Sequence, residues 1–241
     1  MNWLLFFISF LALLVGLASR AEGQIPETFT NLQVLPKDID RRILIETMRS
    51  FSFALGVRCE HCHLGGPMLD QVDFASDERE AKGIARRMLR MVEAINREHI
   101  SPIRGGETTV QCFTCHRGVA RPVTIESIME TVLDADGAEA AVARYRELRN
   151  DHYGRGSYDF GDIPLNRLGE ALLGAGKAGE AISILELNAE FHADSAWVHQ
   201  LLGEAYLASG DREKARASFE KSLTIAPENS AAKKRLEELE K

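Results

Sequence analysis

Apolar residues recur at helical spacing near the start of the chain. The first stripe consists of Leu44, Met48, Phe51 and Leu55. Intervals of four, three and four residues place these side chains on one face of a helix. Asp38 is expected to cap the start of this helix, and Gly56 follows the stripe as a natural C-terminal stop.

A second stripe follows a polar loop that is expected over residues 64–75. It consists of Ile84, Met88, Met91 and Ile95. Ser76 and the acids after it are expected to begin this helix, and the pattern fades near His99, ahead of Ser101-Pro102. The spacing predicts that both methionines face inward.

The second half of the chain repeats itself with a period of 34 residues. Leu168-Gly169-Glu170-Ala171 returns as Leu202-Gly203-Glu204-Ala205, and the same shift relates Gly176 to Gly210, Ala181 to Ala215 and Leu185 to Phe219. This period is typical of tetratricopeptide repeats, in which each unit is a pair of helices. Residues 138–150 are expected to form half of a preceding repeat, and residues 231–241 a charged capping helix.

Residues 1–23 have the features of an export signal. The run from Trp3 to Leu17 is apolar, and Ala21 and Gly23 offer cleavage sites. About 15 apolar residues at 1.5 Å each reach about 22 Å, less than the ~30 Å hydrocarbon core of a bilayer. Because no Lys or Arg precedes the run, an uncleaved N-terminal anchor is the alternative.

All four cysteines lie in two Cys-x-x-Cys-His strings. The strings contain Cys59, Cys62 and His63, and Cys112, Cys115 and His116. Two such cysteine pairs in an exported protein could form disulfides or hold zinc. A histidine directly after the second cysteine is instead the c-type haem attachment signature: the thiols bond to the haem, and the imidazole is the proximal iron ligand. The sequence therefore predicts two covalently bound haem c groups.

Charge also divides the chain. Residues 24–123 hold 14 Lys and Arg against 13 Asp and Glu, and residues 124–241 hold 14 against 22. Arginines near the haem strings are candidates for pairing with haem propionates, because a guanidinium binds a carboxylate through two hydrogen bonds. The candidates are Arg58, Arg87, Arg117 and Arg121, with Arg86 and Arg90 nearby. Compositional bias towards arginine is the alternative explanation.

The sixth iron ligand separates an electron carrier from a haem that binds small molecules. Met48 lies seven residues before Leu55, about 10 Å from the helix end. A haem tethered just past Gly56 and folded back along the helix would place its iron near this thioether. For the second haem, spacing alone leaves Met88 and Met91 both open.

The stretch from about Leu35 to Pro122 resembles half of the tetrahaem cytochrome c subunit of photosynthetic reaction centres. The likeness is carried by MRSFSFALGVRCEHCH, FASDEREAKGIARRMLRMVEAIN, VQCFTCHRG and the RP that follows. It implies that each haem lies parallel to a helix that donates its methionine, which is Met48 for the first haem and Met88 for the second. Two haems and the lipid-anchoring cysteine of that family are missing here. His61 and His99 are expected to be exposed, not ligands.

These observations predict an all-α protein with a signal at residues 1–23, a small di-haem c-type cytochrome domain at 24–130 and a short tetratricopeptide-repeat solenoid at 131–241. The expected function is periplasmic electron transfer by two His/Met-ligated haems, not catalysis. Expected partners are redox proteins, a membrane complex among them, and a protein or second copy bound by the repeats, but not nucleic acid. The alternatives are a di-haem peroxidase or reductase with one open haem, and an assembly scaffold.

Overall fold

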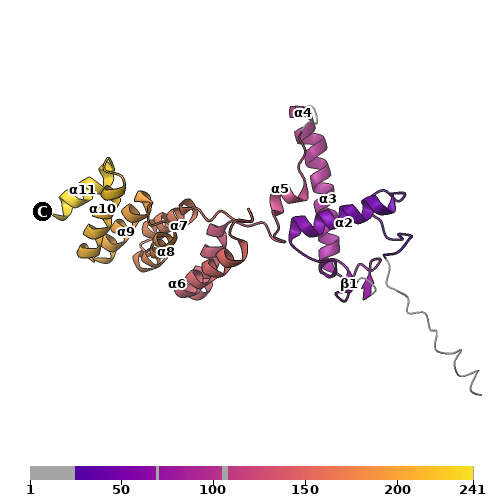
Figure 1. The fold of residues 1–241 in the computed structure, drawn as a ribbon, viewed down its shortest axis with the longest axis horizontal. Helices are drawn as coiled ribbons and strands as arrows, with labels where there is room; N and C mark the ends of the chain where they lie inside the picture. The colour runs from indigo at the N-terminus through magenta and orange to yellow at the C-terminus, as the bar shows by residue number, and fades with distance from the viewer. Residues whose placement is uncertain (1–24, 69–70, 105–107, 241) are drawn as a thin grey trace, which may run out of the picture. The chain divides into compact units, whose positions relative to one another are not determined.

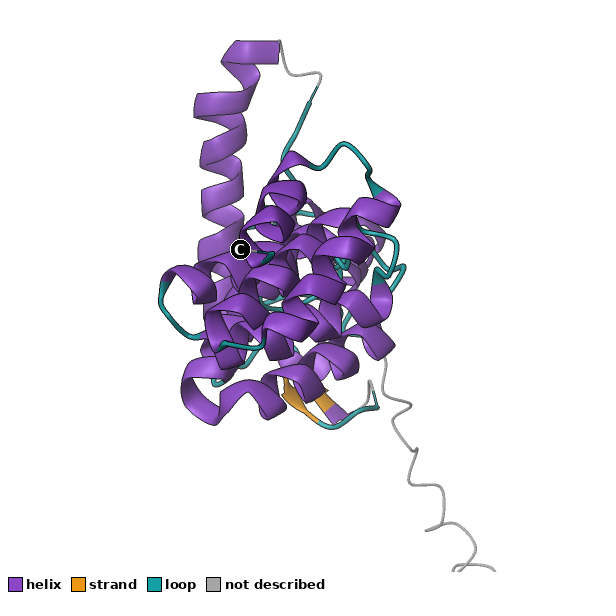
Figure 2. Ribbon diagram, turned by 90° about the vertical axis from the view of Figure 1, so that its left-hand side faces the viewer, coloured by secondary structure: helices purple, strands orange, loops and turns teal. Residues whose placement is uncertain are grey.

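The computed structural model describes residues 25–68, 71–104 and 108–240, so the expected signal at 1–23 lies outside the described residues. Contacts divide the chain into two compact units, with the boundary between Ala120 and Arg121 (Figure 1). Nearly all of the described elements are helices, apart from one short hairpin (Figure 2). The prediction of an all-α fold is confirmed.

The first unit is built on two longer helices and several short elements. In chain order these are α2 (Arg41–Leu55), the 3-10 turn η1 (Cys59–His61), β1 (Leu64–Gly65), β2 (Val72–Asp73), α3 (Glu80–Ala94), the π-helical turn η3 (Ile95–Ile100), α4 (Ser101–Arg104) and α5 (Cys112–His116). Strands β1 and β2 pair antiparallel within the stretch that the sequence predicted to be a polar loop. Both haem strings begin in a helical turn, which brings their two cysteines to the same side.

Helix α2 begins at a different cap from the one expected. The carboxylate of Asp40 accepts the amides of Arg42 and Ile43 at 2.9 and 3.2 Å, so the prediction of Asp38 as cap is wrong. The prediction for the other end is confirmed, because Gly56 adopts the left-handed conformation with φ 65°. That conformation is strained for any residue with a Cβ.

Helix α3 starts later and continues further than the sequence predicted. The hydroxyl of Ser76 accepts the amide of Glu78 within the preceding loop, and α3 begins only at Glu80. The helix does not fade near His99, because η3 and α4 carry it on to residue 104. Ser76 therefore shapes the loop before the helix and does not cap α3 itself.

The second unit is a series of helices around one apolar core. Its members are α6 (Ile125–His152), α7 (Asp162–Gly174), α8 (Ala178–Phe191), α9 (Ala196–Ser209), α10 (Arg212–Ile225) and α11 (Ser230–Leu239). Gly137, at φ 84° and ψ −178°, breaks α6 into two segments. The first segment contributes Ile125 and Met129 to the repeat core. A complete helical pair therefore stands where the sequence indicated half a repeat, and this unit begins earlier than residue 131.

The 34-residue period is a packing requirement. A Cβ on Gly169 would lie 2.6 Å from the side chain of Leu185, and a Cβ on Gly203 would lie 2.5 Å from the ring of Phe219. Each glycine lets the first helix of a pair approach the large side chain of the second. The repeated Leu-Gly-Glu-Ala string thus marks a tight contact within α7–α8 and within α9–α10.

Among the described residues, none of the helices combines the length and apolar character that a bilayer span requires.

Candidate functional site

The first haem string lines a cavity of about 410 Å³ in the first unit. Cys59, Cys62 and His63 reach this cavity from η1 and the residues just after it. Met48 reaches it from the middle of α2. The structure therefore brings two thiols, an imidazole and a thioether to the walls of one hollow. None of these cysteines, nor Cys112 and Cys115 of the second string, forms a disulfide.

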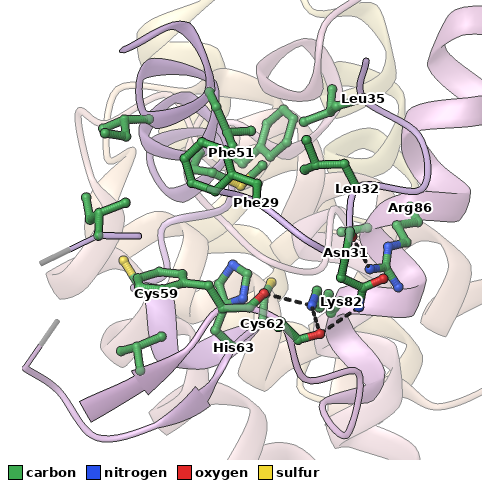
Figure 3. Close-up of a pocket in the computed structure, with 18 of the residues that line it drawn as sticks. Phe29, Asn31, Leu32, Leu35, Phe51, Cys59, Cys62, His63, Lys82 and Arg86 are labelled. Carbon is green, nitrogen blue, oxygen red and sulfur yellow. Dashed lines mark hydrogen bonds between the residues drawn. The ribbon is translucent and has the colours of Figure 1, made fainter. Parts of the chain in front are cut away.

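The segment before α2 supplies much of the apolar wall. Phe29, Leu32 and Leu35 lie with Phe51 of α2 on the side of the cavity away from His63 (Figure 3). The sequence analysis assigned no role to this segment. The signal was present in the three large apolar residues at intervals of three, which a solvated loop would not carry.

The imidazole of His63 is half-buried beside a cation. Burial, and then the nearby Lys82, lower the pKa of His63 below its ordinary value. The neutral ring that results has a nitrogen lone pair to offer a metal. Its ring packs edge-on against Phe74, with centroids 5.1 Å apart, and its Nδ1 is buried without a hydrogen-bond partner in the described structure.

Lys82 is a buried cation next to the first site. It is 8% exposed, and its Nζ donates to the carbonyls of Phe74, Ala75 and Ser76 at 3.0, 3.1 and 2.7 Å. The same Nζ lies 3.1 Å from a carboxylate oxygen of Asp77. The sequence analysis missed Lys82, because a lysine within a helix usually lies in solvent.

Asp77 connects this lysine to the rest of the first unit. Arg86 pairs with the Asp77 carboxylate at 2.9 Å, and the Asn31 amide donates to it at the same distance. Hydrogen bonds from Arg86, Asn31 and Lys82, in that order of effect, hold the pKa of Asp77 well below its usual range. The carboxylate is therefore charged at any ordinary pH, and it ties α3 to the segment before α2.

The second haem string forms the short helix α5. Cys112 and His116 are half-buried, and Cys115 is exposed. His116 Nδ1 lies 3.0 Å from the carbonyl of Val119. Since only a protonated Nδ1 can donate to a carbonyl, this contact leaves Nε2 with the lone pair, as in histidines that bind metals. The geometry of His116 therefore fits the proximal ligand that the sequence predicted.

The methionines of α3 are more exposed than the sequence predicted. Met88 is 40% and Met91 47% exposed, and Ile84 on the same face is 39% exposed. The prediction that both methionines face inward, towards a haem, stays a prediction. They lie three residues apart on one apolar face, and their similar exposure does not choose between them.

The chain entering the second string is held by one side chain. Asn96 of η3 donates to the carbonyl of Val110 at 2.8 Å and accepts the amide of Val110 at 2.7 Å. These two hydrogen bonds have the same pattern as those between paired β-strands, and they fix the backbone two residues before Cys112. Nothing in the sequence pattern singles out Asn96, because its partner lies 14 residues away.

The remaining polar candidates lie mostly at the surface. His61 is exposed, as predicted, and His99 is exposed within η3. Arg58 is exposed and lines the first cavity, whereas Arg86 is half-buried in its pair with Asp77. The other arginines expected to pair with propionates are exposed: Arg87, Arg117 and Arg121. Their pairing with propionates remains a prediction.

The donor sets of both sites fit a covalent haem c. At the first site the cavity is largely apolar and two thiols, one imidazole and one thioether line it. At the second site the bond from His116 to Val119 sets the tautomer that an iron ligand needs, and α3 offers an apolar face with two thioethers.

Sequence comparison relates the chain to c-type cytochromes. The model of the family described as "Photosynthetic reaction centre cytochrome C subunit" matches residues 17–152. Cytochrome c-554 of Chloroflexus aurantiacus is 39% identical over 94 residues, which are 39% of this chain and 21% of the relative. The photosynthetic reaction center cytochrome c subunit of Thermochromatium tepidum is 34% identical over 94 residues, covering 38% and 21%. The chain thus spans about a fifth of the length of these curated relatives.

The second unit has its own matches. A tetratricopeptide-repeat model matches residues 196–229. Among solved structures, the second TPR domain of human RPAP3, determined with an HSP70 peptide, aligns with 49% of this chain and 93% of its own at 17% identity and a TM-score of 0.36. The first TPR of Spaghetti, bound to an HSP90 peptide, aligns with 48% and 87% at 17% identity and a TM-score of 0.35.

Proposed function

This chain belongs to the photosynthetic reaction centre cytochrome c subunit family, and from that premise we propose that it is an exported electron carrier with two covalently bound haem c groups. The observation that carries the proposal is the first cavity, where Met48 faces the same hollow as Cys59, Cys62 and His63. An iron with strong ligands on both faces exchanges electrons and leaves no site for a substrate.

Each of the two proposed haems would be held by its own set of residues. Cys59 and Cys62 would tether the first haem, with His63 as proximal and Met48 as distal ligand. Cys112 and Cys115 would tether the second, with His116 as proximal ligand and Met88 as distal ligand, Met91 being the alternative. A haem bound in this way takes up and gives back one electron.

The surroundings of the first site favour electron exchange over chemistry on a substrate. Phe29, Leu32 and Phe51 line the hollow with apolar surface. Burial and Lys82 keep His63 neutral, so that its lone pair is available. Burial, with Cys59 nearby, also raises the pKa of the Cys62 thiol, which keeps it protonated before attachment.

The second unit is proposed to bind a protein partner. Tetratricopeptide repeats present extended surfaces to other chains, and this unit packs around a core of its own. The excess of acidic residues after position 123 favours a basic partner. Export to the periplasm, with a signal or an uncleaved anchor at residues 1–23, is part of the same proposal.

The proposed function is tested by coulometric titration of the purified protein, made in a host that attaches haem c. The expected result is two one-electron steps per chain and no spectral change when carbon monoxide is added to the reduced form, since both irons are six-coordinate. Rapid binding of carbon monoxide to one haem of the unaltered protein would favour the di-haem enzyme instead.

A further inference from the structure

Lys82 is placed where its charge acts on the first site. A lysine ammonium has three N–H donors, and Lys82 directs them at three successive carbonyls of residues 74–76. All its donors are therefore used inside the protein, and none is left to bind a haem propionate. Figure 3 shows Lys82 close to His63 and Cys62 at one end of the cavity.

The carbonyls that Lys82 holds belong to the loop that supports His63. Phe74, whose carbonyl is one of the three, packs its ring edge-on against the imidazole at 5.1 Å between centroids. Lys82 thus fixes both the ring and the backbone that His63 faces.

The charge of Lys82 is only partly cancelled. Asp77 is its carboxylate partner at 3.1 Å, but Asp77 is shared with Arg86 at 2.9 Å. The cluster of two cations and one anion carries a net positive charge. Both cations line the cavity, together with Arg49 and Arg58, and the carboxylate that lines it is Asp73. The cavity is therefore electropositive, and Lys82 is its most deeply buried charge.

We infer that Lys82 is a positioning and tuning residue, which holds the 74–76 loop against His63 and raises the reduction potential of the first haem. This inference rests on the proposed function. A positive charge close to the iron favours the reduced form, which carries one positive charge fewer. The effect is large where the dielectric constant is low and screening by salt is weak.

Redox titration of the purified holoprotein tests this role with two variants of opposite effect. Lys82→Met removes the cation and should lower one of the two midpoint potentials. The expected shift corresponds to a change of about tenfold in the reduction equilibrium, which is 59 mV for one electron. Asp77→Asn leaves both cations without their acid and should raise the same potential. The potential of the other haem should stay the same in both variants.

Lys37→Met is the matched control. Lys37 is the other lysine between residues 25 and 120 and is exposed, so its loss should move neither potential. A purely structural lysine would give a different result, because loosening of the loop would shift the potential in the same direction in both charge variants. Shifts of the same sign, or no shift, overturn the inference.

Two further outcomes are also decisive. If Lys82→Met does not fold, Asp77→Asn decides alone: a rise of one potential supports the role of the charge, and a fall or no change overturns it. An unaltered chain without covalent haem overturns the proposed function and this inference together. A chain with both haems and unmoved potentials overturns only the role of Lys82.

Discussion

The amide of Gly118 donates a hydrogen bond of 2.9 Å to the carbonyl of Ala54. Ala54 lies in the last turn of α2, ahead of the first haem string, and Gly118 follows the second string after one residue. A Cβ on Gly56 would lie 2.0 Å from the carbonyl oxygen of Gly118. The two strings are therefore held together by a backbone contact that leaves no room for a side chain.

Gly56→Ala should destabilise the first unit more than an ordinary surface substitution. The new methyl group would meet the Gly118 carbonyl, and the left-handed conformation costs a residue with a Cβ a further 1–2 kcal/mol or so. We expect a loss of at least about 2 kcal/mol in the free energy of unfolding, measured by urea denaturation. Gly83→Ala in α3 is the control: its Cβ would meet only a flexible arginine at 3.9 Å, so stability should not fall.

Gly203→Ala should destabilise the repeats for a different reason. Its methyl group would overlap the Phe219 ring, whose atoms lie 2.5 to 2.7 Å from the Cβ position. Overpacking of this kind costs about 1–3 kcal/mol, measured by thermal denaturation of the full chain. In contrast, Gly179→Ala in α8 meets nothing within 4 Å and should hold or raise the melting temperature. Equal melting temperatures for Gly203→Ala and Gly179→Ala would show that α9 and α10 can move apart to admit the methyl group at no cost in stability.

The distal ligands are tested by conservative substitution. Met48→Leu and Met88→Leu keep the volume and apolar character of the side chain, so packing should change by less than about 1.5 kcal/mol. Each variant should nevertheless contain one haem that becomes high-spin and binds carbon monoxide, as optical spectra would show. Met91→Leu is the control and should leave both haems six-coordinate. If Met91→Leu opens a haem and Met88→Leu does not, the assignment of Met88 is wrong.

The pH dependence of stability should report on Asp77. The pKa of this carboxylate is lower in the folded chain than the ~3.9 of an unfolded one. Its stabilising contribution is therefore complete above about pH 4 and is lost as the pH falls towards the folded pKa. Asp77→Asn should be less stable than the unaltered protein at pH 7, and the gap should narrow below pH 4.

Acid denaturation followed by circular dichroism measures this dependence. Asp38→Asn alters an exposed carboxylate away from the network and should follow the unaltered protein at every pH. An Asp77→Asn variant that loses stability with acid as steeply as the parent would contradict the assignment to Asp77.

Sequence reasoning succeeded where the chemistry is local. The stop at Gly56 follows from the backbone freedom of one residue, and the glycine of Leu-Gly-Glu-Ala follows from a repeated packing contact with Leu185 or Phe219. The start of α2 was missed because Asp38 and Asp40 are equally good caps by composition. Only the hydrogen bonds from the backbone amides of Arg42 and Ile43 to the Asp40 carboxylate distinguish the two.

Other features depend on distant parts of the chain. Burial of Lys82 requires three carbonyls of a loop whose path the sequence does not specify. Exposure of Met88 depends on what packs over α3, because a hydrophobic stripe indicates that a face is covered without saying by what. If the cover is the haem itself, the sequence pattern and the exposed methionine agree.

The most direct test of the account is the mass of the intact chain under denaturing conditions, after expression with c-type haem maturation. The account predicts the mass of the polypeptide plus two covalent haems. It predicts one haem fewer in each of the variants Cys59→Ser/Cys62→Ser and Cys112→Ser/Cys115→Ser. A mature chain that carries one haem or none would contradict it.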